Sequence, residues 1–272
     1  MTPKNEQKAA PAKKPDTRTS GEKAVDIAAD VVDRLFIYFF VLILLFCGYA
    51  IYDSLMVYRE AELPTKVAEY AKKDERQLTT EVDFNSLRAI NNEIVGWVQL
   101  NDTKVDFPIT HTDNNSYYLT RSYTREYSLA GSIYLDARNN GNFTDDYSVI
   151  YGHNMNDEMM FGGLKEFDDA AFFATHQKGK LFTPDKTYEL EVLAYIKTDK
   201  MDQVVYDVPF IRNGKNSFIL QHAAEKSTNQ RNLDTRKHLL ALSTCHGHDG
   251  ERVVLLTAFG DEISTPESES DN

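Results

Sequence analysis

Cysteine is scarce in this chain of 272 residues, which contains only Cys47 and Cys245. Cys47 lies in a long apolar segment near the N-terminus, whereas Cys245 lies far down the chain among polar residues. A thiol at bilayer depth cannot reach one in a water-exposed domain, so we expect no intramolecular disulfide. One unpaired cysteine in an outward-facing domain is unusual, because free thiols oxidise unless they are buried or used.

Positive charge is also in short supply. The chain carries 30 Lys and Arg against 42 Asp and Glu, which gives a net charge of -12. A protein that binds the phosphate backbone needs a basic face to release counterions, so nucleic acid is excluded as a partner. The sequence also lacks a second cysteine pair or an HxxxH pattern, so we expect neither a metal site nor a cofactor.

A long apolar run near the N-terminus predicts a membrane anchor. Residues 1–30 open with a stretch rich in Lys, Pro, Thr and Ala, and we expect them to be disordered and cytoplasmic. Residues 35–52 then carry no charge and correspond to about 27 Å of helix, close to the hydrocarbon thickness of a bilayer. We therefore predict a single-pass transmembrane anchor over residues 31–58, in contact with lipid through residues 35–52. A buried core helix is the alternative, although such a helix rarely lacks a polar face over this length.

The flanks of this segment favour a permanent anchor with its N-terminus in the cytoplasm and the rest of the chain outside. Lys and Arg residues are denser before the segment than after it. By the positive-inside rule, this bias favours a cytoplasmic N-terminus. A cleaved signal peptide fits less well, because the apolar run is long and no small-x-small site follows it. A lipoprotein signal is disfavoured because bulky Phe46 precedes Cys47.

Residues 59–95 are expected to form a helical extension. Apolar residues at helical spacing predict one helix over residues 55–78 and a second that starts near residue 82 and ends near Gly96. The apolar positions of the second helix are Phe84, Leu87, Ile90 and Ile94.

Residues 96–261 change character and predict a single domain that is mostly β. Eight β-branched and aromatic runs, bounded by Asn, Asp, Gly and Pro, are typical of a closed barrel or a sandwich. Helical interruptions are expected at 159–176 and 208–226, and residues 262–272 form an acidic, flexible tail. The eight runs are 96–100, 104–110, 131–137, 147–152, 178–183, 187–198, 238–245 and 252–260.

The stretch LSTCHGHDGER at 242–252 is chemically dense and allows two interpretations. Cys245, His246, His248 and Asp249 could hold a metal ion, but zinc ligands usually come in pairs separated by two to four residues, with a distant second pair. The alternative is a bare thiol for covalent chemistry. The six residues between the two apolar runs read as a hairpin loop, which places Cys245 and Arg252 at the same rim.

A cysteine nucleophile needs a proton donor and acceptor within hydrogen-bond reach. His153 stands out among the histidines because it directly follows the apolar run YSVIYG, at the point where a buried strand becomes a loop. We therefore expect His153 to lie at a barrel rim, as Cys245 does.

These residues together resemble the sortase family, and more closely its class B. YGHNM at 151–155, LSTC at 242–245 and the downstream Arg252 form a specific combination. The resemblance covers roughly residues 50–260 and includes DNNSYYL at 113–119 and GSIYLDARN at 131–139. Class B is further suggested by the two expected helices before the barrel and by the helical insertion before the penultimate strand.

The resemblance implies a fold, an activity and partners. The fold is a closed eight-stranded sortase-type β-barrel preceded by helices and a transmembrane helix. The activity is that of a cysteine transpeptidase at a Gram-positive cell surface, which cleaves a C-terminal sorting signal of a secreted protein and holds the acyl group as a thioester. An amine of the cell-wall peptide precursor then resolves the thioester, although some class B relatives polymerise pilins through a Lys amine.

Site residues follow from this resemblance and from chemistry. Cys245 is the expected nucleophile, His153 the general acid and base, and Arg252 the group that holds the substrate carbonyl or the oxyanion. Ser243 lies on the same strand face as Cys245 and could line the substrate groove or be a satisfied hydroxyl in the barrel wall. The expected substrate-binding residues are Tyr151, Asn154, Ser243 and Thr244, with Tyr151 and Asn154 also candidates to orient the imidazole.

Two further functions remain open from sequence. A secreted cysteine peptidase would use the same Cys245 and His153, but it would normally fix the histidine with Asn or Asp and would not require Arg252. An adhesion or scaffold module would make Cys245 a buried core thiol.

Overall fold

The computed structural model describes residues 17–61, 70–74, 79–233, 238–245 and 250–263. The chain forms two units, an N-terminal unit, Met1–Ser54, and a larger unit, Leu55–Asn272.

The N-terminal unit contains most of the helix α1, Ser20–Ala61, whose residues from Leu55 onward belong to the larger unit. The helix begins at Ser20 because Thr19 and Glu22 form a capping box. The Thr19 backbone N–H donates to the Glu22 carboxylate (2.8 Å), and the Glu22 backbone N–H donates to the Thr19 hydroxyl (3.4 Å). Residues 20–30 are therefore helical, and the prediction of disorder was wrong for them.

The segment Ser20–Arg59 is long and apolar enough to cross a membrane, judged by length and composition. Large apolar side chains along it, such as Leu44 and Phe46, are exposed. In water such exposure is costly, whereas a bilayer accommodates it, so the helix has the properties that the sequence predicts for an anchor.

A two-stranded sheet and a short helix precede the barrel. β1 and β2 pair in antiparallel fashion, and Asp83 caps α3 by accepting the Ser86 backbone N–H (3.0 Å). The second expected helix is thus present, but it ends at Ile90 and not near Gly96, and Ile94 begins the next strand. Helix was also a wrong prediction for residues 71–74, and the strand at 79–82 was not predicted. Three of the four residues of β2 are β-branched, which favours the extended conformation. The bounds are Ala71–Asp74 (β1), Thr79–Val82 (β2) and Phe84–Ile90 (α3).

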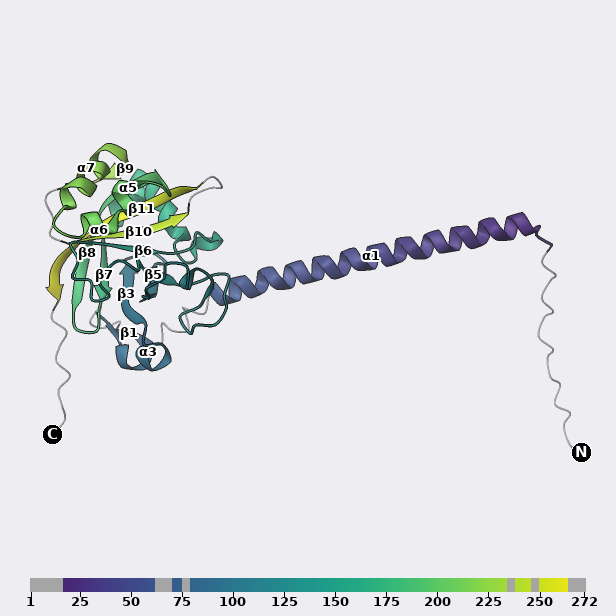
Figure 1. Ribbon diagram of the computed structural model, residues 1–272, viewed down its shortest axis with the longest axis horizontal. Coiled ribbons are helices and arrows are strands. Elements are labelled where there is room, and N and C mark those ends of the chain that lie inside the picture. Colours follow the sequence, from purple (N-terminus) through teal and green to yellow (C-terminus); the bar gives the residue numbers. More distant parts are fainter. Residues whose placement is uncertain (1–16, 62–69, 75–78, 234–237, 246–249, 264–272) are drawn as a thin grey trace, which may run out of the picture. The chain divides into compact units, whose positions relative to one another are not determined.

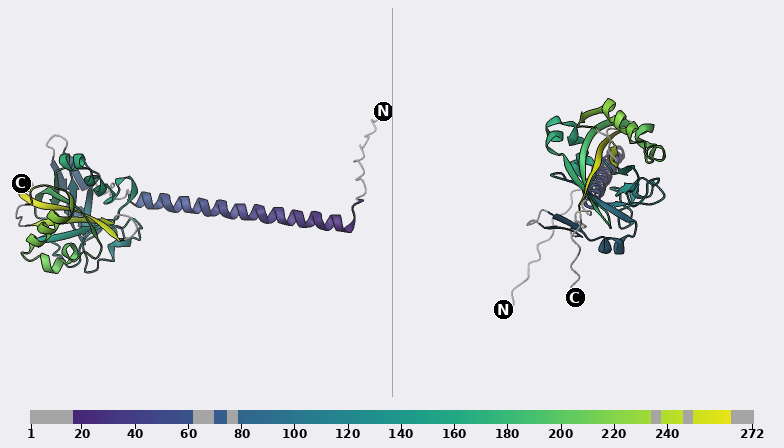
Figure 2. Two further views of the ribbon diagram at one scale, coloured as in Figure 1. Left: turned by 90° about the horizontal axis from the view of Figure 1, so that it is seen from above. Right: turned by 90° about the vertical axis from the view of Figure 1, so that its left-hand side faces the viewer.

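Eight strands close into a barrel in the order β11-β10-β6-β5-β4-β3-β7-β8, and β8 pairs back with β11 (Figures 1 and 2). Each of the eight predicted strands is present, and closure through β8 and β11 decides for a barrel over a sandwich. A short strand, β9, adds to the other edge of β8. The bounds are Ile94–Leu100 (β3), Asp106–Thr110 (β4), Ile133–Leu135 (β5), Tyr147–Tyr151 (β6), Lys178–Phe182 (β7), Thr187–Asp199 (β8), Ser227–Gln230 (β9), Leu239–Cys245 (β10) and Glu251–Ile263 (β11).

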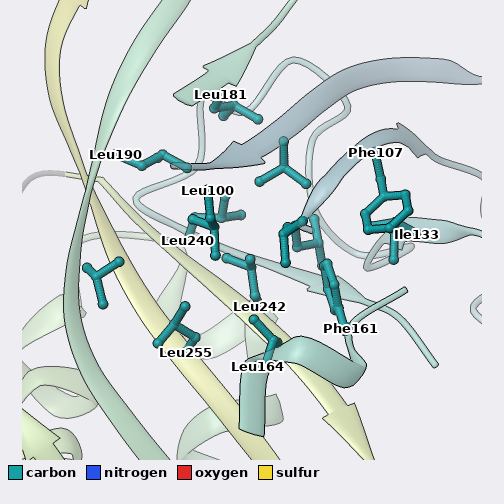
Figure 3. Packing of buried hydrophobic residues seen from close by; sticks show 14 of the residues in the cluster. Leu100, Phe107, Ile133, Phe161, Leu164, Leu181, Leu190, Leu240, Leu242 and Leu255 are labelled. Carbon is teal, nitrogen blue, oxygen red and sulfur yellow. The ribbon is translucent and has the colours of Figure 1, made fainter. Parts of the chain in front are cut away.

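Apolar side chains fill the barrel interior (Figure 3). In β10, Leu240 and Leu242 belong to this interior cluster, whereas Leu239 and Ala241 belong to a second cluster on the outer face. The strand is therefore buried on both faces, which explains why its sequence is apolar without alternation.

Short helices cover the outer cluster and form the expected insertion before the penultimate strand (Figure 1). Asp202 and Asp207 cap the first two of these helices by accepting backbone N–H groups of their first turns. The prediction of a helical interruption at 208–226 is confirmed, and so is that at 159–176. The bounds are Gln203–Tyr206 (α5), Val208–Ile211 (α6) and Asn216–Lys226 (α7) for the insertion, and Gly162–Asp168 (η4) and Ala170–Thr175 (α4) for the earlier interruption.

Candidate active site

The strands that lead to the two candidate catalytic residues are direct neighbours in the barrel. β6 and β10 run parallel, with Ser243 opposite Tyr151, and the Gly152 backbone N–H donates to the Ser243 carbonyl (3.1 Å). Parallel strands advance in the same direction, so the backbones of His153 and Cys245, each two residues further on, reach the same rim.

The strand β11 starts at this rim as well. The Cys245 backbone pairs with Arg252 across the antiparallel β10–β11 pair, and Arg252 also pairs with Thr198 of β8. This is the hairpin register that the sequence predicts. His246, His248 and Asp249 lie outside the described residues, and within the described part of the chain no three His, Cys, Asp or Glu side chains could share a metal ion.

The imidazole of His153 is held by a backbone carbonyl. Its Nε2 lies 2.8 Å from the carbonyl oxygen of Leu119, in the short helix η2 (Tyr118–Thr120). Since a carbonyl only accepts hydrogen bonds, Nε2 carries the proton in this arrangement. The carbonyl thus occupies the orienting position that Asn or Asp fills in many cysteine peptidases.

Gly131 makes this close approach possible. Its φ is +62°, in the left-handed region, and a Cβ atom there would lie 2.7 Å from the Leu119 carbonyl oxygen and 3.1 Å from Cδ2 of His153. Any side chain at residue 131 would therefore press on both partners of the hydrogen bond.

A small hollow of about 70 Å³ opens beside the imidazole. Five residues predicted from the sequence as site residues line it, together with Gly152, Leu119 and Tyr134. The predicted residues are Tyr151, His153, Ser243, Thr244 and Arg252.

Sequence reasoning did not single out Leu119 and Tyr134 as site residues. Each lies in a run that carries the family resemblance, Leu119 in DNNSYYL and Tyr134 in GSIYLDARN, so a signal was present. Leu119 acts on His153 through its backbone, which its residue type does not reveal.

Among the described residues, the guanidinium of Arg252 has one hydrogen bond, from its Nη1 to the carbonyl of the adjacent Glu251 (3.2 Å). Arginine stays charged throughout the physiological range, and Arg252 brings this charge to the lining of the hollow.

The other predicted residues differ in their surroundings. Tyr151 donates its hydroxyl hydrogen bond to Asp136 Oδ2 (2.8 Å) instead of to His153, and Ser243 Oγ lies 2.9 Å from the Tyr206 hydroxyl. Burial, and then the Asp136 charge, raise the pKa of Tyr151, so its hydroxyl stays neutral. Thr244 Oγ1 is buried and has no hydrogen-bond partner among the described residues. Asn154 does not line the hollow; its backbone bridges to Met160.

Comparison with known proteins finds relatives of this chain both in sequence and in structure. The chain is 32% identical to Sortase B of Listeria monocytogenes over 165 residues, which is 60% of this chain and 67% of that protein. It is 28% identical to Sortase B of Staphylococcus aureus over 178 residues, 64% of this chain and 72% of that protein. A crystal structure of a Streptococcus pyogenes class B sortase involved in pilus biogenesis matches with a TM-score of 0.61 and 33% identity, covering 66% of this chain and 98% of that one. No protein-family model matches the chain.

The closed eight-stranded barrel and these likenesses define a sortase, that is, a cysteine transpeptidase. Sortases are cell-surface enzymes that act on proteins bearing a sorting signal. More narrowly, the chain belongs to the class B sortases. The family and activity that the sequence motifs predict are thereby confirmed, and the non-catalytic adhesion module is excluded.

Proposed function

We propose that Cys245 is the nucleophile of this sortase, with His153 as general acid and base and Arg252 as the group that stabilises the oxyanion. The backbone register carries the proposal. Cys245 lies opposite Arg252, and its strand runs beside the strand that leads to His153. The hollow lined by His153 and Arg252 supplies room for a peptide carbonyl next to them.

In the acylation step, the Cys245 thiolate attacks the carbonyl carbon of the scissile peptide bond and a C–S bond forms. The C–N bond breaks as the His153 imidazolium gives its proton to the departing amine. The N-terminal part of the substrate remains on Cys245 as a thioester, and the imidazole is left neutral.

In the transfer step, an incoming amine attacks the thioester carbonyl and forms a new amide. The C–S bond breaks, the Cys245 thiolate leaves, and neutral His153 takes the proton released by the amine. General acid and base catalysis of this kind is worth about 10²- to 10⁴-fold in rate. The cycle ends with Cys245 as a thiolate and His153 as an imidazolium, the forms with which it began.

Arg252 is proposed to bind the carbonyl oxygen on which negative charge develops. Its charge is permanent, and its donors are arranged in a planar fork that suits an oxyanion. Tyr151, Ser243 and Thr244 are proposed substrate-binding residues because they line the same hollow. Asn154 stays a prediction from the resemblance.

We propose that the acceptor is an amine of the cell-wall peptide precursor. The alternative, a Lys side chain of a pilin subunit, is favoured by one observation, the 33% identity to a class B sortase involved in pilus biogenesis. The acyl-enzyme is incubated with each amine, and the products are identified by mass spectrometry. Only the true acceptor should form an amide faster than water hydrolyses the thioester.

The anchor and its orientation are likewise proposed. Residues 31–58 cross the membrane with the N-terminus in the cytoplasm, residues 59–95 form the extension, and residues 96–261 form the catalytic domain outside. The predicted acidic tail, 262–272, was wrong for residues 262 and 263, which belong to β11, and its other residues lie outside the described ones. Protease added to intact cells should remove the catalytic domain and spare the N-terminus, and the reverse pattern would refute this orientation.

The catalytic roles are tested with full-length protein in detergent. Wild type incubated with a candidate surface protein should give an acyl-enzyme, and its mass identifies the cleaved bond and Cys245 as the attachment site. Cys245→Ala should give none. Arg252→Ala should lose both peptide cleavage and amine transfer, whereas full cleavage by this variant would indicate a peptidase-like mechanism.

A further inference from the structure

Asp136 is a fully buried acidic residue directly after β5, and it does not line the hollow. Its carboxylate accepts a bidentate pair of hydrogen bonds from Arg138, with Nε 2.8 Å from Oδ1 and Nη2 2.7 Å from Oδ2. The Arg138 backbone N–H adds a third bond to Oδ1 (2.9 Å). A buried carboxylate is costly unless it is paired and hydrogen-bonded, and here both conditions are met.

The same ion pair reaches three separate segments around the site. Asp136 Oδ2 accepts hydrogen bonds from the hydroxyl of Tyr151 in β6 (2.8 Å) and from Nδ2 of Asn115 (3.2 Å). Arg138 Nη2 also donates to the backbone carbonyl of Tyr206, at the end of α5 (3.0 Å). The pair therefore joins the barrel, the loop before η2 and the helical insertion.

One of these connections ends at Tyr151, which lines the hollow, and another ends at Tyr206, directly behind the lining. The Tyr151 ring lies between those of Tyr134 (centroids 5.3 Å apart) and Tyr206 (6.3 Å, stacked). The Tyr206 hydroxyl in turn lies 2.9 Å from Ser243 Oγ, which lines the hollow beside Tyr151. Displacing either tyrosine would change the surface that a peptide meets.

The carboxylate is ionised under physiological conditions. Burial by itself would raise the pKa of Asp136, but the hydrogen bonds from Arg138 and Tyr151 and the Arg138 charge together hold it below its ordinary value. The negative charge is thus a constant feature of the folded protein.

We propose that Asp136 is a positioning residue for substrate binding: it fixes Tyr151, which lines the hollow, directly, and through Arg138 it holds Tyr206, which supports Ser243 from behind. The inference rests on the proposed function in one respect, that the hollow receives the sorting-signal peptide. Asp136 contacts no reacting atom in this proposal, so it should affect how the substrate binds and leave the chemistry at Cys245 intact.

The test uses full-length Asp136→Asn, which keeps the shape of the side chain and removes its charge. The substrate probe is a quenched fluorescent peptide with the sequence recovered from the wild-type acyl-enzyme. Loss of a charge-assisted hydrogen bond changes a binding constant by roughly ten- to a hundredfold. We therefore expect KM to rise by about that factor. We expect kcat to change less than about twofold, because Asp136 contacts no reacting atom and its loss should affect substrate binding alone.

Alkylation of Cys245 by iodoacetamide supplies a second readout that needs no peptide. We expect Asp136→Asn to react at the wild-type rate, with the modified peptide identified by mass. The matched control is Asp106→Asn, another carboxylate that accepts a bond from an aromatic donor, Trp97 Nε1 (2.7 Å), outside the hollow. This control should keep the wild-type KM.

The route of the effect is tested with Tyr151→Phe, which keeps the ring and removes the hydroxyl. If Asp136 acts mainly through Tyr151, the double variant should raise KM no further than Asp136→Asn does alone. An unchanged KM in Asp136→Asn would overturn the proposal. The proposal would also fail if kcat and the alkylation rate fell as much as KM rose, in step with a lower thermal stability. A wild-type protein that forms no acyl-enzyme would instead refute the proposed catalytic roles.

Discussion

Replacing Gly131 by Ala tests whether the Leu119 carbonyl orients the imidazole of His153, the proposed general acid and base. Residue 131 has a φ of +62°, which costs Ala about 1–2 kcal/mol. The new Cβ would also lie 2.7 Å from the Leu119 carbonyl oxygen and 3.1 Å from Cδ2 of His153, so one of these groups must move. Such overpacking adds about 1–3 kcal/mol. We therefore expect the free energy of unfolding to fall by roughly 2–5 kcal/mol.

The expected effect on catalysis is larger than the effect on folding alone explains. A shift of the order of 1 Å in a catalytic group can lower the rate about 10²-fold, and the 2.8 Å bond between Leu119 and His153 cannot survive such a shift. The assay is the rate of acyl-enzyme formation by mass spectrometry, at a temperature where circular dichroism shows the variant to be folded. Urea unfolding of the same preparation measures stability.

Gly214→Ala is the matched control. Gly214 also has a positive φ, +78°, but a Cβ atom there would meet only Asp146 Oδ2 at 3.9 Å. This variant should lose the conformational term of about 1–2 kcal/mol and keep its acylation rate. The role assigned to the Leu119 carbonyl would be refuted if Gly131→Ala formed the acyl-enzyme at the wild-type rate, or if both variants slowed its formation equally.

Three further outcomes are expected. Leu242→Ala should lower the free energy of unfolding by about 2–5 kcal/mol in urea titrations, because Leu242 is fully buried in the barrel interior; a loss below 1 kcal/mol would contradict this packing. Tyr118→Phe should cost about 1–3 kcal/mol and slow acylation, since the lost hydroxyl donates to Glu93 (2.6 Å) and holds the backbone next to Leu119; a neutral variant would show that this bond is dispensable. The pKa of Asp136 is lowered by folding, so its contribution to stability is full above about pH 4 and declines as the pH falls below that. Urea titrations from pH 2 to 5 should show a steeper acid loss for wild type than for Asp136→Asn, and parallel curves would count against the shift.

The strands of the barrel could be predicted from the sequence because each is a compact apolar run between turn residues. The uninterrupted apolar character of β10 correctly indicated burial on both faces. The rim shared by Cys245 and Arg252 followed from the short loop between two such runs. Local composition was sufficient in these places because the hydrophobic pattern and the turn chemistry agree.

Other features depend on contacts that local sequence does not encode. The Leu119 carbonyl that holds His153 is backbone, so its role is independent of residue type. Asp136 falls near the end of the predicted run 131–137, and local sequence does not show that its carboxylate is buried and accepts a hydrogen bond from Tyr151 in the next strand. β1 was missed because apolar residues at helical spacing predicted one helix over residues 55–78, whereas backbone pairing with β2 decides the conformation of residues 71–74.

The closure of the barrel through β11 has a consequence for biosynthesis. The strand that completes the barrel is the last one in the described chain, and it pairs with both β8 and β10. A ribosome delivers β6, which leads to His153, long before β10, and β10 gains its second neighbour only when β11 has emerged. A chain interrupted before β11 therefore has Cys245 without Arg252 in register beside it, so the proposed site is assembled only when synthesis of the fold is complete.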